Sequence, residues 1–114
     1  MKKFKSGRHT AAFILLFLAE SPNYGGQLLK MCEERLYANT IDSAILYRML
    51  NKLEKEGAIS SYWETVEEGQ PRKWYKLNAL GRAQLSEFYD DIVKRQRNFD
   101  LFLIHYKQLM EDEQ

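Results

Sequence analysis

The chain has few of the residues that build covalent frameworks, and it lacks a long apolar segment. Its 114 residues include one cysteine, Cys32, which cannot form a disulfide within the chain and favours a reducing compartment. The longest apolar run, Ala11 to Ala19, is shorter than the roughly 20 residues that a membrane span needs. No small-residue cleavage site follows this run, so we expect no signal peptide. These absences predict a cytoplasmic protein without a membrane segment.

The chain also lacks a large excess of positive or negative charge, since its net charge is only +1 at pH 7. Basic residues are more frequent near the start and acidic residues in the tail. A composition of 29% charged and 45% hydrophobic residues is typical of one globular domain. Because the run Ala11–Ala19 is apolar on every side, it must be covered on both faces. A chain of this size has little material for that cover, which suggests a partner chain.

Helix signals occupy the first half of the sequence. Thr10 is the expected cap of a first helix that ends before Pro22, and a second helix begins near Tyr24. Leucines at spacings of three and four continue in the second helix. A connector then leads to Asp42 or Ser43, either of which would cap a third helix.

The second half begins where Gly57 ends the third helix. Two strands joined by a turn are expected next, and Asn78 would cap a last helix that extends to about Met110. This order is that of a winged helix-turn-helix. We therefore predict a mainly α fold with a two-stranded β-hairpin. Residues 1–82 would form the DNA-binding domain and residues 83–114 a dimerisation helix.

The outer side of the third helix carries side chains suited to reading DNA. In a helix-turn-helix, the second helix of the pair lies in the major groove. Arg48 could bind guanine and Asn51 adenine, whereas Lys52 would contact phosphate. A merely solvated face would have a similar composition, and the basic hairpin favours the DNA interpretation. The candidate DNA-binding residues are Tyr24, Gln27, Ser43, Ala44, Tyr47, Arg48, Asn51, Lys52, Arg72 and Lys73.

The hairpin combines basic and aromatic residues. Arg72 and Lys73 would contact phosphate, while Trp63, Trp74 and Tyr75 would dock the hairpin on the helices, because an isolated hairpin is barely stable. Other charged groups remain open to two interpretations. Lys2, Lys3, Lys5 and Arg8 would form either a DNA-binding arm or a solvated end, and Glu67 and Glu68 would face away from DNA or discourage loose binding.

The last helix carries apolar residues at alternating steps of three and four, which is a heptad seam with Arg95 as its polar interruption. Its simplest partners are the same helix and the first helix of a second copy. The seam would be either plain dimer core, with Arg95 reaching solvent, or a hollow for a flat ligand whose carboxylate pairs with Arg95. The candidate dimer and ligand residues are Phe13, Phe17, Leu85, Phe88, Ile92, Arg95, Phe99, Phe102 and Tyr106, followed by Leu109.

Signals for catalysis are absent from the sequence. No nucleophile–base pair, metal cluster or phosphate-binding loop is visible, so we expect no enzyme, no cofactor and no metal site. His9 and His105 lack the neighbours that a metal site needs. Cys32 is expected to be a small buried apolar residue.

Three motifs follow one another along the chain: "YGGQLL" from Tyr24, "LYRMLNKLEKEGAI" from Leu46 and "PRKWYKLNALG" from Pro71. In this order they resemble the PadR-like transcriptional regulators with a single C-terminal helix. The resemblance covers residues 12–82. Three positions depart from the family pattern: Asn78 replaces a threonine, Gly26 a second aromatic residue, and Arg48 a proline.

The resemblance implies a bacterial repressor that binds double-stranded DNA as a homodimer on a near-palindromic operator. It also implies a response to small aromatic or amphipathic compounds. The alternative is a winged-helix module that binds protein and not DNA.

Overall fold

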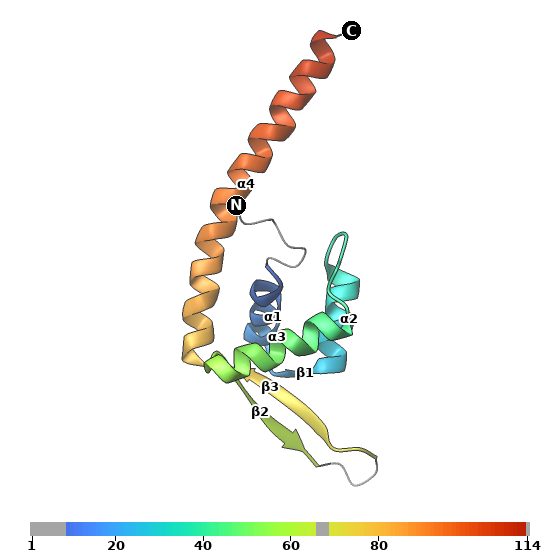
Figure 1. Ribbon diagram of the computed structural model, residues 1–114, viewed down its shortest axis with the longest axis vertical. Helices are drawn as coiled ribbons and strands as arrows, with labels where there is room; N and C mark the ends of the chain where they lie inside the picture. The colour runs from blue at the N-terminus through green and yellow to red at the C-terminus, as the bar shows by residue number, and fades with distance from the viewer. Residues whose placement is uncertain (1–8, 66–68, 114) are drawn as a thin grey trace.

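The computed structural model describes residues 9–65 and 69–113. The predicted arm of Lys2, Lys3, Lys5 and Arg8, and the acidic pair Glu67 and Glu68, lie outside the described residues. Three helices pack over a small sheet, and a fourth helix extends far from them (Figure 1). The elements are α1 (Thr10–Glu20), β1 (Asn23–Tyr24), α2 (Gly25–Arg35), α3 (Ser43–Glu56), β2 (Ile59–Glu64), β3 (Arg72–Leu77) and α4 (Ala79–Asp112).

The sheet has three antiparallel strands in the order β1-β3-β2. The hairpin of β2 and β3 matches the prediction, but the additional strand β1 was not expected. It pairs Asn23 with Tyr75 and Tyr24 with Trp74. A strand of two residues is too short to show the alternation by which strands are found in a sequence. This pairing ties the start of α2 to the hairpin.

Helix α1 lies at the centre of the core and contacts α2, α3, α4 and β3. Ile14, Leu15 and Leu18 are buried there together with Leu28, Leu46 and Leu50 of α2 and α3. The expectation that α1 needs a partner chain for cover is therefore largely wrong, because this chain's own elements surround most of it. Leu16 is the exception, with 42% of its surface exposed.

Most helix ends lie where the sequence predicted them, including the end of α1 before Pro22 and the start of α2 after Tyr24. Asp42 caps α3, since its Oδ1 accepts a hydrogen bond from the Ile45 N–H at 2.8 Å. Gly57 ends α3 in the left-handed conformation, with φ of 87°. Thr10 is not a cap, because it lies inside α1 and is buried, and His9 occupies the cap position.

Asn78 occupies the cap position of α4 but makes no side-chain bond to that helix. Its Nδ2 donates to the Gly57 carbonyl at 3.2 Å, and its Oδ1 accepts from the Ser60 hydroxyl at 3.1 Å. The predicted position of Asn78 at the start of α4 is therefore confirmed, but its side chain does not bond to that helix. Asn78 instead joins the end of α3 to β2, because the chain reversal brings these segments beside it.

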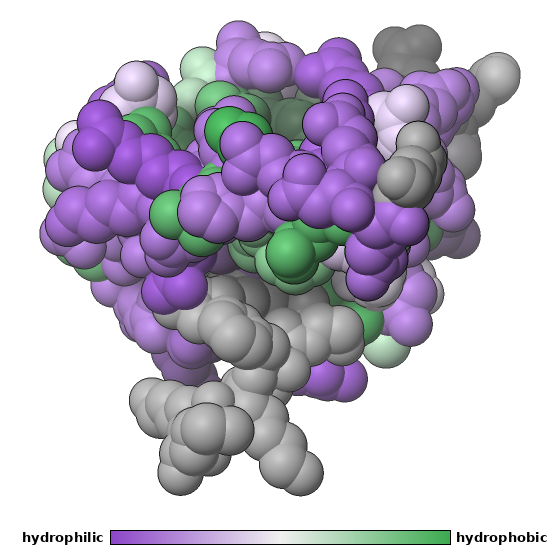
Figure 2. Space-filling view, turned by 90° about the horizontal axis from the view of Figure 1, so that it is seen from above, coloured by the Kyte–Doolittle hydropathy of each residue, from purple (hydrophilic) through white to green (hydrophobic). Residues whose placement is uncertain are grey.

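Helix α4 has two parts with different surroundings. In the proximal part, Leu85 and Phe88 pack against the core, whereas every residue from Gln96 to Glu113 is exposed. We call residues 96–112 the distal half of α4. This half makes the molecule long, with extents of 67 × 28 × 28 Å. From above, apolar side chains form only small patches among the polar ones (Figure 2).

Candidate nucleic-acid interface

Helix α3 presents one side to solvent over its whole length. Leu46, Leu50 and Leu53 hold its inner side in the core. We call the exposed side the reading face, and all of its residues except Lys55 are candidates named from the sequence. It consists of Ser43, Ala44, Tyr47, Arg48, Asn51, Lys52 and Lys55. This side is therefore accessible to a large partner.

Tyr47 is held differently from the rest of the reading face. Its ring lies over the start of α2, where a Cβ on Gly25 would be 2.5 Å from the Tyr47 hydroxyl. Only glycine leaves room for this contact, which gives a steric reason for the Tyr-Gly motif. Tyr47 is still 44% exposed, so one edge remains accessible. Gln27, in the first turn of α2, is half-buried.

One basic residue of the hairpin is exposed and supported by an aromatic stack. The Arg72 guanidinium lies 4.1 Å from the centre of the Tyr24 ring. That ring meets Trp74 edge-on, with centroids 5.3 Å apart. Stacking on an aromatic ring stabilises a cation while leaving its N–H groups free to donate. Arg72 is thus pre-oriented on the outer face of the sheet.

Lys73, the second hairpin residue predicted to contact phosphate, is half-buried and contacts other residues of the chain. Lys73 lies on the opposite face of β3, with its Nζ 3.6 Å from Glu54 of α3 and 5.4 Å from the Tyr75 ring. Ser61 donates a hydrogen bond to the same Glu54. The Tyr75 ring beside Lys73 is buried, and this burial is the largest cause that raises the pKa of the Tyr75 hydroxyl. Lys73 therefore joins the hairpin to α3.

The sequence suggested that both tryptophans dock the hairpin on the helices, but in the structure their roles differ. Trp74 is half-buried against Tyr24, and Tyr75 is buried in the core, as expected. Trp63 was expected to anchor the hairpin, but 65% of its surface is exposed. It is the next-to-last residue of β2, where the strand extends beyond the helices. Alternation along a strand predicts the face of a residue but not how far the covering layer reaches.

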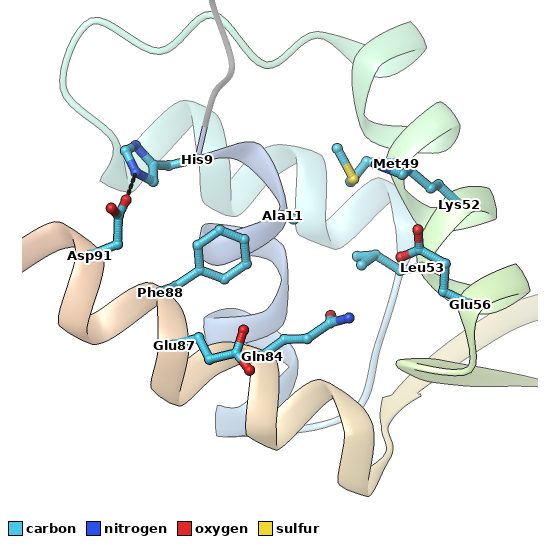
Figure 3. A pocket seen from close by; sticks show the side chains of 10 residues that line it. All are labelled: His9, Ala11, Met49, Lys52, Leu53, Glu56, Gln84, Glu87, Phe88 and Asp91. Atoms are coloured by element: carbon cyan, nitrogen blue, oxygen red, sulfur yellow. Dashed lines mark hydrogen bonds and ion pairs between the residues drawn. The ribbon is translucent and has the colours of Figure 1, made fainter.

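A groove of about 530 Å³ lies on the other flank of α3, between this helix, the start of α1 and the proximal part of α4 (Figure 3). Phe88 is the only predicted ligand residue among its lining side chains. Phe17 is buried in the core, while Phe99 is 67% exposed on the distal half of α4. The predicted lining is therefore not brought together within this chain. The groove is lined by His9, Ala11, Met49, Lys52, Leu53, Glu56, Gln84, Glu87, Phe88 and Asp91.

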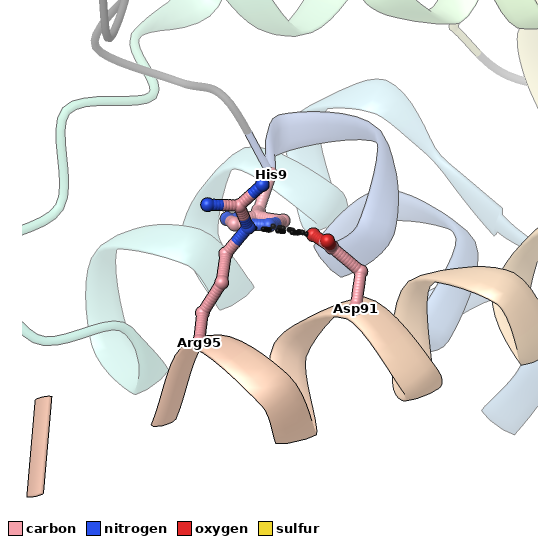
Figure 4. Close-up of polar contacts among 3 residues, drawn as sticks. All are labelled: His9, Asp91 and Arg95. Carbon is pink, nitrogen blue, oxygen red and sulfur yellow. Dashed lines mark hydrogen bonds and ion pairs between the residues drawn. The ribbon is translucent and has the colours of Figure 1, made fainter. Parts of the chain in front are cut away.

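Two residues that line this groove, His9 and Asp91, form a polar cluster with Arg95 (Figure 4). Asp91 Oδ2 accepts from Arg95 Nε at 2.9 Å and lies 3.1 Å from His9 Nε2. The His9 ring also meets Phe88 edge-on at 6.3 Å. Arg95 thus pairs with Asp91 of its own helix, while 29% of its side chain remains exposed. The cluster joins the start of α1 to α4.

The predicted seam remains exposed along the distal half of α4. Phe102 and Tyr106 stack with centroids 6.0 Å apart, but both face solvent. Leu101, Leu103 and Ile104 are further exposed apolar residues of this half, and the heptad pattern did not predict them. Leu16 on α1 is exposed as well. The short apolar run from Leu101 to Ile104 was the available signal, since it extends beyond a narrow heptad seam.

Features of other protein classes are not found in the described ranges. Residues 9–65 and 69–113 contain no group of three side chains that could hold a metal ion. In the same ranges, no helix combines the length and apolar character required to span a membrane. Cys32 is buried, as predicted, and burial followed by the nearby Glu33 carboxylate raises the pKa of its thiol.

Comparison with known proteins agrees with this geometry. An uncharacterized protein from Lysinibacillus sphaericus is 31% identical over 96 residues, which cover 83% of this chain and 88% of that protein. The crystal structure of a PadR family transcription regulator from Clostridium difficile has a TM-score of 0.74 at 23% identity, covering 83% of this chain and 98% of that one.

A third comparison is with Bacillus subtilis PadR, whose crystal structure is a complex with operator DNA. It has a TM-score of 0.65 at 21% identity and covers 72% of this chain and 47% of that one. The winged-helix fold is common to these structures. Residues 14–87 match the sequence pattern of the transcriptional regulator PadR-like family. As the resemblance had indicated, the chain belongs to this family, which consists of regulators and not of enzymes.

Proposed function

We propose that this protein is a cytoplasmic, sequence-specific DNA-binding regulator in which α3 enters the major groove. The observation that carries the proposal is the reading face, an exposed side of α3 flanked by the basic hairpin. Arg48 and Asn51 occupy it with side chains that match guanine and adenine edges. Ser43 and Ala44 lie at its N-terminal end, where a recognition helix meets base edges.

The hairpin then acts as the wing of this regulator. Arg72 is exposed and fixed over Tyr24, so it can donate to a phosphate without losing much conformational freedom. Lys52 of the reading face would contact another phosphate. Because Lys73 pairs with Glu54, its proposed contribution is to orient the wing, with at most a secondary contact to DNA.

We propose a homodimer held by the distal half of α4. An exposed stretch containing Phe99, Phe102 and Tyr106 is unusual for a monomer and typical of an interface. A second copy supplies a matching seam and also the exposed Leu16 and the half-buried Phe13 on α1. Two copies related by a twofold axis would present two reading faces to a near-palindromic operator. Repression is the proposed output, because a bound dimer would occlude a promoter.

A small aromatic effector completes the proposal, and the groove between α3 and α4 is its proposed site. Phe88 and Met49 offer apolar contact there, with carboxylates at the rim. The volume of about 530 Å³ is in the range of small-molecule sites, roughly 300–1,000 Å³. A ligand bound between α3 and the dimerisation helix would favour one angle between them. Such a preference is what an effector needs in order to change DNA affinity.

The test is a gel-shift titration with the DNA upstream of the protein's own gene, in the presence of excess unrelated duplex. We expect a retained complex, and Arg48→Ala should weaken it by about 1–3 kcal/mol and relax its sequence preference. Arg82→Ala is the matched control, because it removes the same charge from an exposed site at the start of α4. Unchanged preference in Arg48→Ala would remove Arg48 as a base-reading residue.

The same titration separates the alternative function. A winged-helix module for protein binding would show no affinity for any duplex and would bind its partner with little salt dependence. A DNA-binding regulator would instead lose affinity steeply as salt rises. Absence of duplex binding at low salt would reject the DNA-binding proposal.

A further inference from the structure

Trp63 is the largest side chain of the wing that the fold leaves uncovered. It is 65% exposed, whereas Trp74, the other tryptophan, is half-buried against Tyr24. Aromatic side chains are the largest apolar surfaces available to a protein, and they are enriched where a partner covers them. An exposed indole in a wing therefore requires an explanation beyond docking of the hairpin.

The register of the sheet places Trp63 on the face that looks toward α3. Successive residues of a strand alternate between faces, so Ile59, Ser61 and Trp63 share one face of β2. Ile59 and Tyr75, the cross-strand partner of Ser61, are buried, which identifies this as the helix side. Trp63 lies directly opposite Lys73, toward the tip of the wing.

The neighbours of Trp63 are fixed to α3. Glu54 of α3 accepts the hydrogen bond from Ser61 and pairs with Lys73 at 3.6 Å. Ser61 is two positions before Trp63 in β2, and Lys73 is the cross-strand partner of Trp63. The position of the indole relative to α3 is therefore set by contacts on both strands. The negative charge of Glu54 is also paired with the Lys73 cation.

We propose that Trp63 is a DNA-contacting residue that packs against the sugar–phosphate edge of the duplex between the reading face and the wing. This inference rests on the proposed function. The occupant is double-stranded DNA because the cations Arg48, Lys52 and Lys55 lie on the exposed side of the same α3. The indole covers deoxyribose carbons, and its N–H can donate to a phosphate oxygen. Such a contact is independent of sequence and orients the wing along the backbone.

The presence of only two tryptophans allows a direct test. In Trp74→Phe, the emission of Trp63 is the only indole signal, and it can be followed while a labelled random-sequence duplex is titrated at low salt. Anisotropy of the label reports binding independently. We expect the Trp63 emission to change as the anisotropy rises, and its quenching by acrylamide to decrease. The converse protein, Trp63→Phe, should show little change in emission.

The two possible failures are distinguishable. Rising anisotropy with unchanged Trp63 emission and acrylamide quenching would overturn the inference and leave the proposed function intact. No rise in anisotropy at any salt would reject both.

Substitution gives a second measurement. Trp63→Ala should bind duplex roughly tenfold more weakly, in line with the loss of one buried aromatic contact, and Trp63→Phe should retain most of the affinity. Tyr89→Ala is the matched control, because Tyr89 is a similarly exposed aromatic residue on α4. Its affinity should not change. Thermal melting of each variant checks folding, and a Trp63→Ala protein that is folded and binds normally would contradict the inference.

Discussion

At the scale of single residues, two glycines explain much of the family pattern by sterics. Gly25 leaves room for the Tyr47 ring, and Gly81 lets α4 approach the Ala58 carbonyl and the Leu77 side chain. A Cβ at either position would overlap these neighbours. The two glycines differ in the group that a Cβ would meet. At Gly25 it is the Tyr47 ring, which is partly exposed and can move, whereas at Gly81 it is the Ala58 backbone carbonyl in the core, which cannot. Gly81 is therefore the more stringent requirement.

We expect Gly81→Ala to lower the free energy of unfolding by about 1–3 kcal/mol, because its Cβ must displace backbone at Ala58. In a helix without this contact, alanine would raise stability by up to about 1 kcal/mol relative to glycine. Gly26→Ala is the control, since the nearest atom to its Cβ is a Tyr24 ring carbon at 3.4 Å. Urea unfolding measures both. A Gly81→Ala protein as stable as the parent would show that α4 does not approach Ala58 this closely.

At the scale of elements, α4 is one helix with two different sources of stability. The proximal part packs on the core and is joined to α1 through His9, Asp91 and Arg95. The distal half has no cover from this chain. Isolated helices of this length are marginal in water, so packing must supply most of their stability. We therefore propose that the distal half is helical because a second copy covers it.

We expect Phe99→Asp to give monomers in sedimentation velocity, because a carboxylate at the centre of the seam would be buried in the dimer. Its far-ultraviolet circular dichroism should also show reduced helix, since the uncovered distal half would fray. Lys107→Asp provides the control, as Asp100, Lys107 and Glu111 share the polar side of the helix. That variant should remain dimeric. A dimer of unchanged stability in Phe99→Asp would mean that this seam is not the interface.

At the scale of the whole molecule, the proposed function depends on the distance between two reading faces. A twofold pair must present its α3 helices about 34–36 Å apart to enter successive major grooves. In each protomer, the wing is joined to α3 through Glu54, while the groove separates α3 from α4. The reading face and the wing therefore form one unit. An effector bound in the groove between α3 and α4 could change the distance between the two reading faces.

The salt dependence of DNA binding tests this arrangement in the assembled molecule. If Arg72 contacts one phosphate in each protomer, Arg72→Ala should reduce the slope of log K against log salt by about 1.8 per dimer. Lys73→Ala should weaken binding while leaving the slope nearly unchanged, because the Lys73 charge is paired with Glu54. Equal reductions in both variants would mean that Lys73 leaves Glu54 to contact DNA. An unaltered slope in both would exclude the wing from the interface.

The amino-acid sequence by itself determined the order of helices and hairpin, the Asp42 and Gly57 ends of α3, and the outward side of that helix. These features depend on local conformational preference and on the period of apolar residues, which a short window of sequence contains. The tertiary structure alone decided the pairing of β1, the role of Asn78, the exposure of Trp63 and the engagement of Lys73 and Arg95. Each of these depends on which distant segment lies beside the residue and how far it reaches, and no local pattern encodes that distance.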